Sequence, residues 1–248
     1  MWRVGWVAAL VVLLSAPGVG HASDRARAQA AAPPRPRVEL YGDSLLAETS
    51  DVLRTSFQAI EPWWDIEVHA FPGTGICSWW DELRANDAQA VGLLFSGVIM
   101  TDCILGKRKW PEAYLDDARS AARLFADKGT PVIWLGWPRP AGGIVSPHAD
   151  DTIWHYYEEV AAEFGDQVID PGLALFDPRS FSYPLTMRCL TPREPGCVDG
   201  RVPVRDLAGG HLCPVADQIG PCPVYSSGIR RYALAAAREL AAALPDAP

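Results

Sequence analysis

The sequence predicts an α/β fold, a three-layer α/β/α sandwich around a parallel β-sheet. Short, almost continuously apolar runs alternate along the chain with longer segments whose apolar residues recur at helical spacing. Continuous apolar runs are typical of strands buried on both faces of a parallel sheet, and the alternation indicates helices on either side of it. The 248 residues, 49% of them hydrophobic, are enough for one sizeable domain. A net charge of −8 lacks the basic character of nucleic-acid-binding proteins, so no nucleic-acid partner is expected.

The first half of the domain is predicted to contain three strands. We expect them at 38–41, 64–71 and 90–95, with a helix at 44–60 between the first two. The second strand ends in the turn sequence Pro72-Gly73-Thr74-Gly75, and a short helical stretch follows it. Helical crossovers of this kind join neighbouring parallel strands, so these segments are expected in one sheet.

The second half of the domain continues the alternation of strands and helices up to residue 170, and a long loop region follows. Pro111 near the start and Gly129 at the end delimit the clearest helix. The other expected elements are, in order, a strand at 131–135, a helix at 150–164, a strand at 167–170, a long loop region at 171–225, and a last helix capped by Ser226 or Ser227. Structureless segments as long as this loop are usually functional, and we expect disulfides to hold it.

The first residues are predicted to be a secretory signal peptide. A short positive start precedes the apolar run Val4–Leu14, and Gly20-His21-Ala22 resembles a small-x-small cleavage site. The run is shorter than a bilayer span, which favours cleavage over a retained anchor and predicts no stable membrane span in the mature chain. We therefore expect a signal peptide at 1–22 (cleavage as late as 30 is the alternative), a flexible lead-in at 23–36 and the domain at 37–245, in a secreted or cell-envelope protein.

Six cysteines lie after the predicted signal peptide, an even number that suits disulfides in an oxidising compartment. Six cysteines permit 15 pairings, and we favour those that are close in sequence. The favoured pairs are Cys77–Cys103, Cys189–Cys197 and Cys213–Cys222. A zinc site is the alternative, but the chain contains no CxxC pair, so no metal is expected.

Three of the predicted strand ends carry residues suited to chemistry. Gly42-Asp43-Ser44 stands between the first strand and its helix, where Ser44 is either a helix N-cap or a nucleophile at the carboxyl edge of the sheet. Asp43 is expected to stabilise this turn as a hydrogen-bond acceptor. The other two strand ends carry Gly73-Thr74-Gly75 and Ser96-Gly97-Val98. His211, just before the last helix, is expected to return to the same edge.

With these motifs in place, the chain resembles the GDSL family, also called SGNH hydrolases, over most of residues 37–243. Gly42-Asp43-Ser44-Leu45 matches the family's first block, and the text "FSG…TDC" and "GHLCP" is similar to secreted bacterial members with disulfides. The resemblance implies a flavodoxin-like fold and ester hydrolysis without a cofactor. It assigns Ser44 as nucleophile, the backbone N–H of Gly73 to the oxyanion hole, Gly97 to the third block and His211 as general base.

Two positions depart from the family's pattern. Val98 stands where the family usually has an asparagine that donates to the oxyanion, and Ala208 stands where an aspartate usually precedes the histidine. Thr101, or the backbone N–H of Ser44, is expected to replace the missing donor in part. Asp206 is the nearest acid upstream of the histidine, and it is interpreted either as the residue that orients His211 or as an ordinary loop carboxylate.

The predicted function is therefore that of a secreted serine esterase or deacylase acting on a small-molecule, lipid or glycan ester. An acyltransferase using the same acyl-enzyme is a close variant. The alternative class is a catalytically weakened envelope protein that binds a glycan or lipid. Trp79 and Trp137 are expected either to line the substrate site or to pack in the core. His69 is expected to be a core or edge residue of its strand, and His148 and His155, seven residues apart with no third ligand nearby, are not expected to bind a metal.

Overall fold

A five-stranded parallel sheet with strand order β2-β1-β3-β4-β5 forms the centre of the computed structural model, which describes residues 34–97, 101–141, 152–215 and 220–245. The predicted signal peptide, nearly all of the lead-in, Val98 and His148 lie outside the described residues. The strands are β1 (Arg37–Gly42), β2 (Asp65–Ala70), β3 (Ala90–Leu94), β4 (Val132–Leu135) and β5 (Gln167–Ile169).

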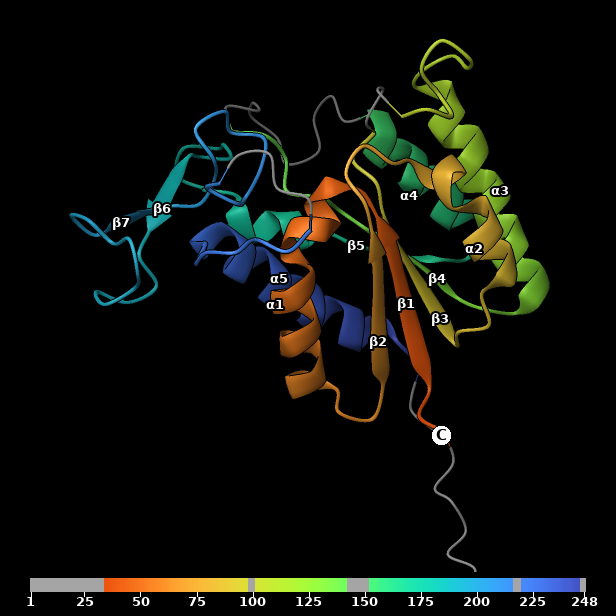
Figure 1. Cartoon of the computed structure of the whole chain (residues 1–248), viewed down its shortest axis with the longest axis horizontal. Helices are drawn as coiled ribbons and strands as arrows, with labels where there is room; N and C mark the ends of the chain where they lie inside the picture. The colour runs from red at the N-terminus through yellow and green to blue at the C-terminus, as the bar shows by residue number, and fades with distance from the viewer. Residues whose placement is uncertain (1–33, 98–100, 142–151, 216–219, 246–248) are drawn as a thin grey trace, which may run out of the picture. The chain divides into compact units, whose positions relative to one another are not determined.

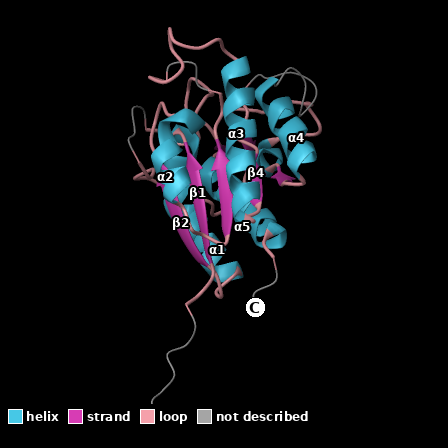
Figure 2. Cartoon of the chain, turned by 90° about the vertical axis from the view of Figure 1, so that its right-hand side faces the viewer, coloured by secondary structure: helices cyan, strands magenta, loops and turns pink. Residues whose placement is uncertain are grey.

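Helices cover both faces of this sheet, so the predicted three-layer α/β/α fold is confirmed (Figures 1 and 2). One face carries α1 (Ser44–Ile60) and α5 (Ser227–Ala243), which pack on each other. The other carries α2 (Trp80–Ala85), α3 (Glu112–Lys128) and α4 (Thr152–Phe164). Short 3₁₀ helices occur at Ile76–Trp79 and Pro171–Leu175.

The strand order places a topological switch point between β1 and β3. From β1 the chain moves to one side to form β2 and then to the other side to form β3. In sheets of this kind, ligands bind beyond the carboxyl ends of the strands at that switch point. Those ends lie at the upper edge of the sheet in Figure 1, and Ser44 follows one of the two strands concerned.

The backbone of β1 approaches β3 very closely at Gly42. A Cβ atom built on Gly42 would lie 2.6 Å from the carbonyl oxygen of Leu94 and 2.7 Å from the Cβ of Leu46. A real side chain cannot occupy that space without moving the backbone of β3 or α1. Glycine is therefore required at position 42, where β1 ends and the turn to α1 begins.

The region predicted as a long loop contains a small antiparallel ribbon that sequence analysis missed. It consists of β6 (Thr186–Arg188) and β7 (Arg201–Pro203), which pair with each other and not with the main sheet. Strands of three residues are too short to show an alternating pattern, so their pairing depends on the surrounding loop.

Three disulfides join the cysteines in the pairs expected from their spacing, Cys77–Cys103, Cys189–Cys197 and Cys213–Cys222. The first links the segment after β2 to the segment after β3. The third links the residues that follow His211 to the segment that leads into α5. Two of the three disulfides thus tie together segments at the carboxyl edge of the sheet.

Among the described residues, we find no helix that combines the length and the apolar character needed to cross a bilayer.

Gly42→Ala tests the close approach of β1 to β3. We expect the free energy of unfolding to fall by about 1–3 kcal/mol, because the added methyl group overlaps the Leu94 carbonyl and Leu46. Gly210→Ala is the matched control, since a Cβ there meets open space, and its effect should stay within about 0.5 kcal/mol. Urea denaturation with the disulfides intact measures both. Equal stabilities for the two variants would contradict the requirement for glycine at position 42.

Candidate active site

The first turn of α1 is held by Asp43, whose carboxylate is fully buried. It accepts hydrogen bonds from the Leu45 amide at 3.0 Å, from the Ser96 amide at 2.8 Å and from the Ser96 hydroxyl at 2.6 Å. Burial raises the pKa of Asp43, and the hydrogen bonds from Ser96 and Leu45 act in the opposite direction. Asp43 therefore stabilises the turn as expected and also fastens it to the residue after β3.

This cap settles one of the two interpretations of Ser44. The N-cap of α1 is Asp43, so the interpretation of Ser44 as the cap is wrong. The reason is geometric. The Asp43 carboxylate accepts the Leu45 amide, and the Asp43 carbonyl accepts the Ala47 amide, which is one of the two amides that a capping serine at position 44 would bind. Ser44 becomes the first helical residue, is half-buried, and its hydroxyl makes no hydrogen bond within the described part of the chain.

Two backbone amides beside Ser44 are available to bind an anion. Amides in the first turn of a helix have no intrahelical acceptor, and that of Ser44 is one of them. Gly73, after β2, has φ +76° and is exposed. In the described ranges neither amide donates a hydrogen bond. Both sequence-predicted oxyanion donors are thus free at the carboxyl edge.

Gly97 lies just after β3, at the same carboxyl edge of the sheet. Its φ is +88°, and a Cβ there would lie 2.6 Å from Cγ1 of Ile153, so both the backbone conformation and the space require glycine. Its carbonyl oxygen accepts a hydrogen bond from the indole of Trp110 at 3.0 Å.

Thr101 and Trp79 both make polar contacts within the loops after β3 and β2. Thr101 is fully buried, and its hydroxyl lies 3.0 Å from the sulfur of Cys103. The indole N–H of Trp79 donates to the hydroxyl of Thr74 at 3.2 Å, and that hydroxyl lies 2.7 Å from the Phe71 carbonyl and 3.2 Å from the Gly42 carbonyl. These contacts connect the loop after β2 to the end of β1.

Trp137 is 5% exposed and packs edge-on against Trp154 and Tyr157, each at a ring separation of 6.1 Å. Little of its surface remains for a substrate, so this geometry favours core packing over the substrate wall that we weighed from the sequence.

His211 lies in the loop before α5, and its ring is directed to helix α1. Its Nδ1 atom is 3.4 Å from Oε2 of Glu48, which is almost fully buried. Asp206 contacts the backbone of His211 instead. Its Oδ1 accepts the His211 amide at 3.0 Å, and its own amide donates to the His211 carbonyl at 2.9 Å. The described residues show no contact between the Asp206 carboxylate and the imidazole.

The surroundings raise the pKa of His211. The largest cause is the hydrogen bond to Glu48, burial opposes it, and the negative charges of Asp206 and Asp43 add to it from farther away. No direct hydrogen bond joins the Ser44 hydroxyl to the ring within the described residues, which is common before substrate binds.

Glu48 is the site residue that sequence analysis missed. Its Oε1 accepts the Leu212 amide and its Oε2 the Cys213 amide, both at 3.0 Å. Its main-chain carbonyl accepts the Cys222 amide at 3.2 Å. The signal was present in "LYGDSLLAE", because an acid four residues after Ser44 lies on the same face of the predicted helix.

Arg205 provides positive charge near Glu48. Its side chain is buried, and burial lowers its pKa to about 10, so it remains protonated at neutral pH. Glu48, Tyr183 and Asp206 are the groups whose charge acts on it.

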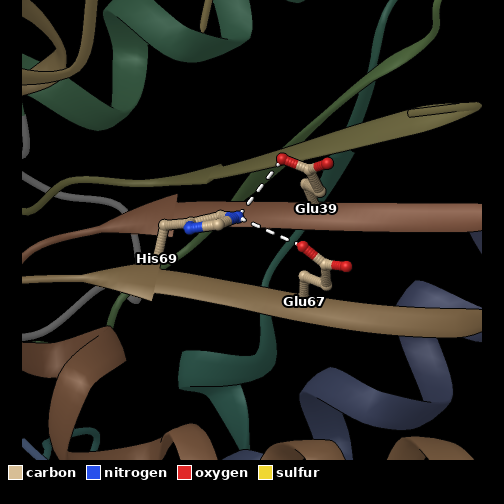
Figure 3. A group of neighbouring side chains, drawn as sticks. All are labelled: Glu39, Glu67 and His69. Atoms are coloured by element: carbon tan, nitrogen blue, oxygen red, sulfur yellow. Dashed lines mark ion pairs between the residues drawn. The ribbon is translucent and has the colours of Figure 1, made fainter. Parts of the chain in front are cut away.

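A second cluster, Glu39, Glu67 and His69, has the composition of a metal site (Figure 3). The Nε2 atom of His69 lies 3.2 Å from Glu39 and 3.8 Å from Glu67. The Glu39 carboxylate already accepts hydrogen bonds from Tyr41, Asn86 and Arg37 at 2.6–2.8 Å. These donors and the Arg37 charge account for the cluster without a metal ion.

Comparisons with known proteins gave solved structures only. No family model and no curated protein matches the chain. A GDSL-like lipase from Bacteroides thetaiotaomicron is 14% identical, with 67% of this chain and 79% of that chain covered and a TM-score of 0.41. The periplasmic domain of a lipopolysaccharide acetyltransferase from Salmonella ser. Paratyphi A is 10% identical, with 84% of both chains covered and a TM-score of 0.47. An acetyl xylan esterase is 13% identical, with 54% and 76% covered and a TM-score of 0.41.

These names agree with the GDSL resemblance seen in the motifs. With identities below 15% and TM-scores below 0.5, the likenesses carry no weight for the chemistry of this chain.

The raised pKa of His211 gives a pH dependence that can be measured. We expect its ring to titrate above the value in the urea-unfolded chain, because the Glu48 carboxylate stabilises the protonated form. A raised folded pKa adds stability that is fully present below the unfolded pKa and lost as the pH rises through the folded pKa. NMR titration of the imidazole nitrogens in both states measures the difference. A folded pKa at or below the unfolded one would contradict the predicted interaction.

Proposed function

We propose that this chain is an ester hydrolase of the GDSL/SGNH type, in which Ser44 is the nucleophile and His211 the general base. One observation carries the proposal. The free hydroxyl of Ser44 stands at the switch point of the sheet, and the ring of His211 is attached to the same helix through Glu48. A serine and an imidazole at one sheet edge are the parts that acyl transfer needs.

In the proposed acylation, Nε2 of His211 takes the proton of the Ser44 hydroxyl while Oγ attacks the ester carbonyl carbon. The carbonyl π pair moves to oxygen, and the amides of Ser44 and Gly73 bind that oxyanion. The pair then returns, the bond from carbon to the alcohol oxygen breaks, and the protonated His211 gives its proton to the leaving alcohol.

Deacylation repeats the sequence with water. His211 accepts a proton from the attacking water, a second oxyanion forms at the same amides, and its collapse releases the carboxylic acid and returns the proton to Ser44. An alcohol in place of water would give acyl transfer by the same steps. The steps use only groups of this chain.

The oxyanion site proposed here has two backbone donors and lacks the usual asparagine, since Val98 takes its place in the sequence. Losing one donor lowers the rate about 10²–10³-fold, whereas enzymes exceed the uncatalysed rate by about 10⁶-fold or more. The missing side chain therefore slows the proposed reaction without abolishing it.

We further propose an extracytoplasmic location and an acyl ester of a small molecule, glycan or lipid as substrate. Three disulfides support the location, because they form and persist in oxidising compartments. The signal peptide proposed for residues 1–22 supplies the route of export.

A serine-reactive fluorophosphonate and a short-chain chromogenic ester test the function. We expect the wild-type protein to be labelled at Ser44 and to hydrolyse the ester. Ser44→Ala should abolish labelling, and His211→Ala should lower the rate about 10⁶-fold because the hydroxyl loses its base. Intact-mass and peptide mass spectrometry locate the label.

The matched control is His155→Ala, which removes an exposed histidine on α4 that pairs with Glu158. It should label and turn over like the wild type. A folded wild-type protein that is neither labelled nor active on a panel of esters would refute the hydrolase and favour the binding protein.

A further inference from the structure

We infer that the carboxylate orienting His211 comes from helix α1, one turn after the nucleophile, and that Glu48 is this positioning residue. The inference rests on the proposed function and differs from the sequence analysis, in which Asp206 was the candidate for this role, with an ordinary loop carboxylate as the alternative.

The contact geometry selects Glu48. Its Oε2 atom lies 3.4 Å from Nδ1 of His211, the ring nitrogen that a triad carboxylate engages. Because the two ring nitrogens point in different directions, this contact leaves Nε2 free to face the serine. Ser44 and Glu48 are four residues apart on one helix and so project from the same face, with about 5–6 Å between their Cβ atoms. The imidazole can therefore stand against both side chains at once.

Glu48 is itself held in a fixed orientation. The amides of Leu212 and Cys213 donate to its two carboxylate oxygens, so the residues after His211 in the chain fix the acid that its ring contacts. The carboxylate is 3% exposed, whereas the His211 side chain is 49% exposed. A carboxylate screened from water interacts more strongly with an imidazolium than one in solvent.

Asp206 is occupied in another way. Its carboxylate accepts the backbone amide of His211, and its amide donates to the carbonyl of the same residue, so it closes the loop. This explains how the chain can have Ala208 at the position of the family's acid. The loop supplies only the imidazole of His211, because the carboxylate that orients it, that of Glu48, belongs to α1.

Several charged groups act on His211 and Glu48. His211 is acted on by Glu48 from α1, Asp206 from its own loop and Asp43 from the β1–α1 turn. Glu48 in turn interacts with the buried guanidinium of Arg205. Replacing Glu48 removes the only one of the three acids that contacts the ring among the described residues.

Glu48→Gln is the decisive variant. Glutamine keeps the size and one acceptor oxygen but loses the charge. We expect kcat for a short-chain ester to fall about 10⁴-fold with little change in KM, as when the carboxylate of other Ser–His–acid sites is replaced. The pKa of His211 should fall as well. Since the ring must be neutral to accept the Ser44 proton, the acidic limb of the rate–pH profile should move to lower pH.

Glu194→Gln is the matched control. Glu194 is a second buried carboxylate, which accepts the Leu190 amide and the hydroxyls of Ser227 and Tyr225. Its replacement should lower the free energy of unfolding, as Glu48→Gln does, because a buried carboxylate is lost in both variants. It should leave the rate–pH profile unchanged. Asp206→Asn should shift the profile less than Glu48→Gln, because its charge acts on the ring from a greater distance. A larger shift for Asp206→Asn, or an unchanged profile in folded Glu48→Gln, would overturn the inference.

Two further measurements keep the result decisive. If Glu48→Gln does not fold, Glu48→Asp retains the charge on a shorter side chain and should lower kcat and the His211 pKa by smaller amounts. If neither kcat nor the His211 pKa changes in Glu48→Asp, the inference is overturned. NMR titration of His211 needs no activity, so it still tests Glu48 if the wild-type protein proves not to be a hydrolase. Absence of labelling at Ser44 then refutes the function, and an unmoved His211 pKa in Glu48→Gln refutes the positioning residue.

Discussion

The buried carboxylate of Glu48 needs hydrogen-bond donors that its own helix cannot provide. A charge removed from water is strongly destabilising unless it is fully partnered. Among the described residues, the donors to this carboxylate are the amides of Leu212 and Cys213, more than 160 residues later, and Nδ1 of His211 lies 3.4 Å from it. Satisfying this one group therefore brings the late loop to the beginning of α1. The disulfide Cys213–Cys222 and the bond from the Cys222 amide to the Glu48 carbonyl hold it there.

Asp43 does the same for the other side of the site. It is buried as well, and its donors come from Leu45 in α1 and from Ser96 after β3. The two acids flank Ser44, one residue before it and four residues after it. The Asp43 carboxylate binds the residue after β3, and the Glu48 carboxylate binds the loop before α5, so both loops are fastened at the first turns of α1.

Local signals predicted most of the fold, because apolar periodicity, Pro111 and Gly129 report on the segment that contains them. The helix predicted at 44–60 and the five main strands have the expected order. The ribbon of β6 and β7 was missed since three-residue strands have no period of their own. Glu48 was missed for a different reason. Its partner is distant in sequence, and the family pattern directed attention to the acid nearest to His211 along the chain.

The position of the acid has a consequence for how precisely the proposed site is built. Side chains four residues apart on one helix keep a fixed relation, because the helix backbone determines both. An acid in the loop with the histidine would instead depend on the conformation of residues 206–210, where Gly209 has φ +76° and Leu207 is fully exposed. With the proposed nucleophile and the proposed positioning acid both on α1, only the imidazole has to be supplied by the loop. Its ring is located by the carboxylate that also binds the next two backbone amides, so one group sets both the position of the loop and the direction of Nδ1. The absence of an acid at position 208 is then compatible with an ordered arrangement of the proposed serine and histidine.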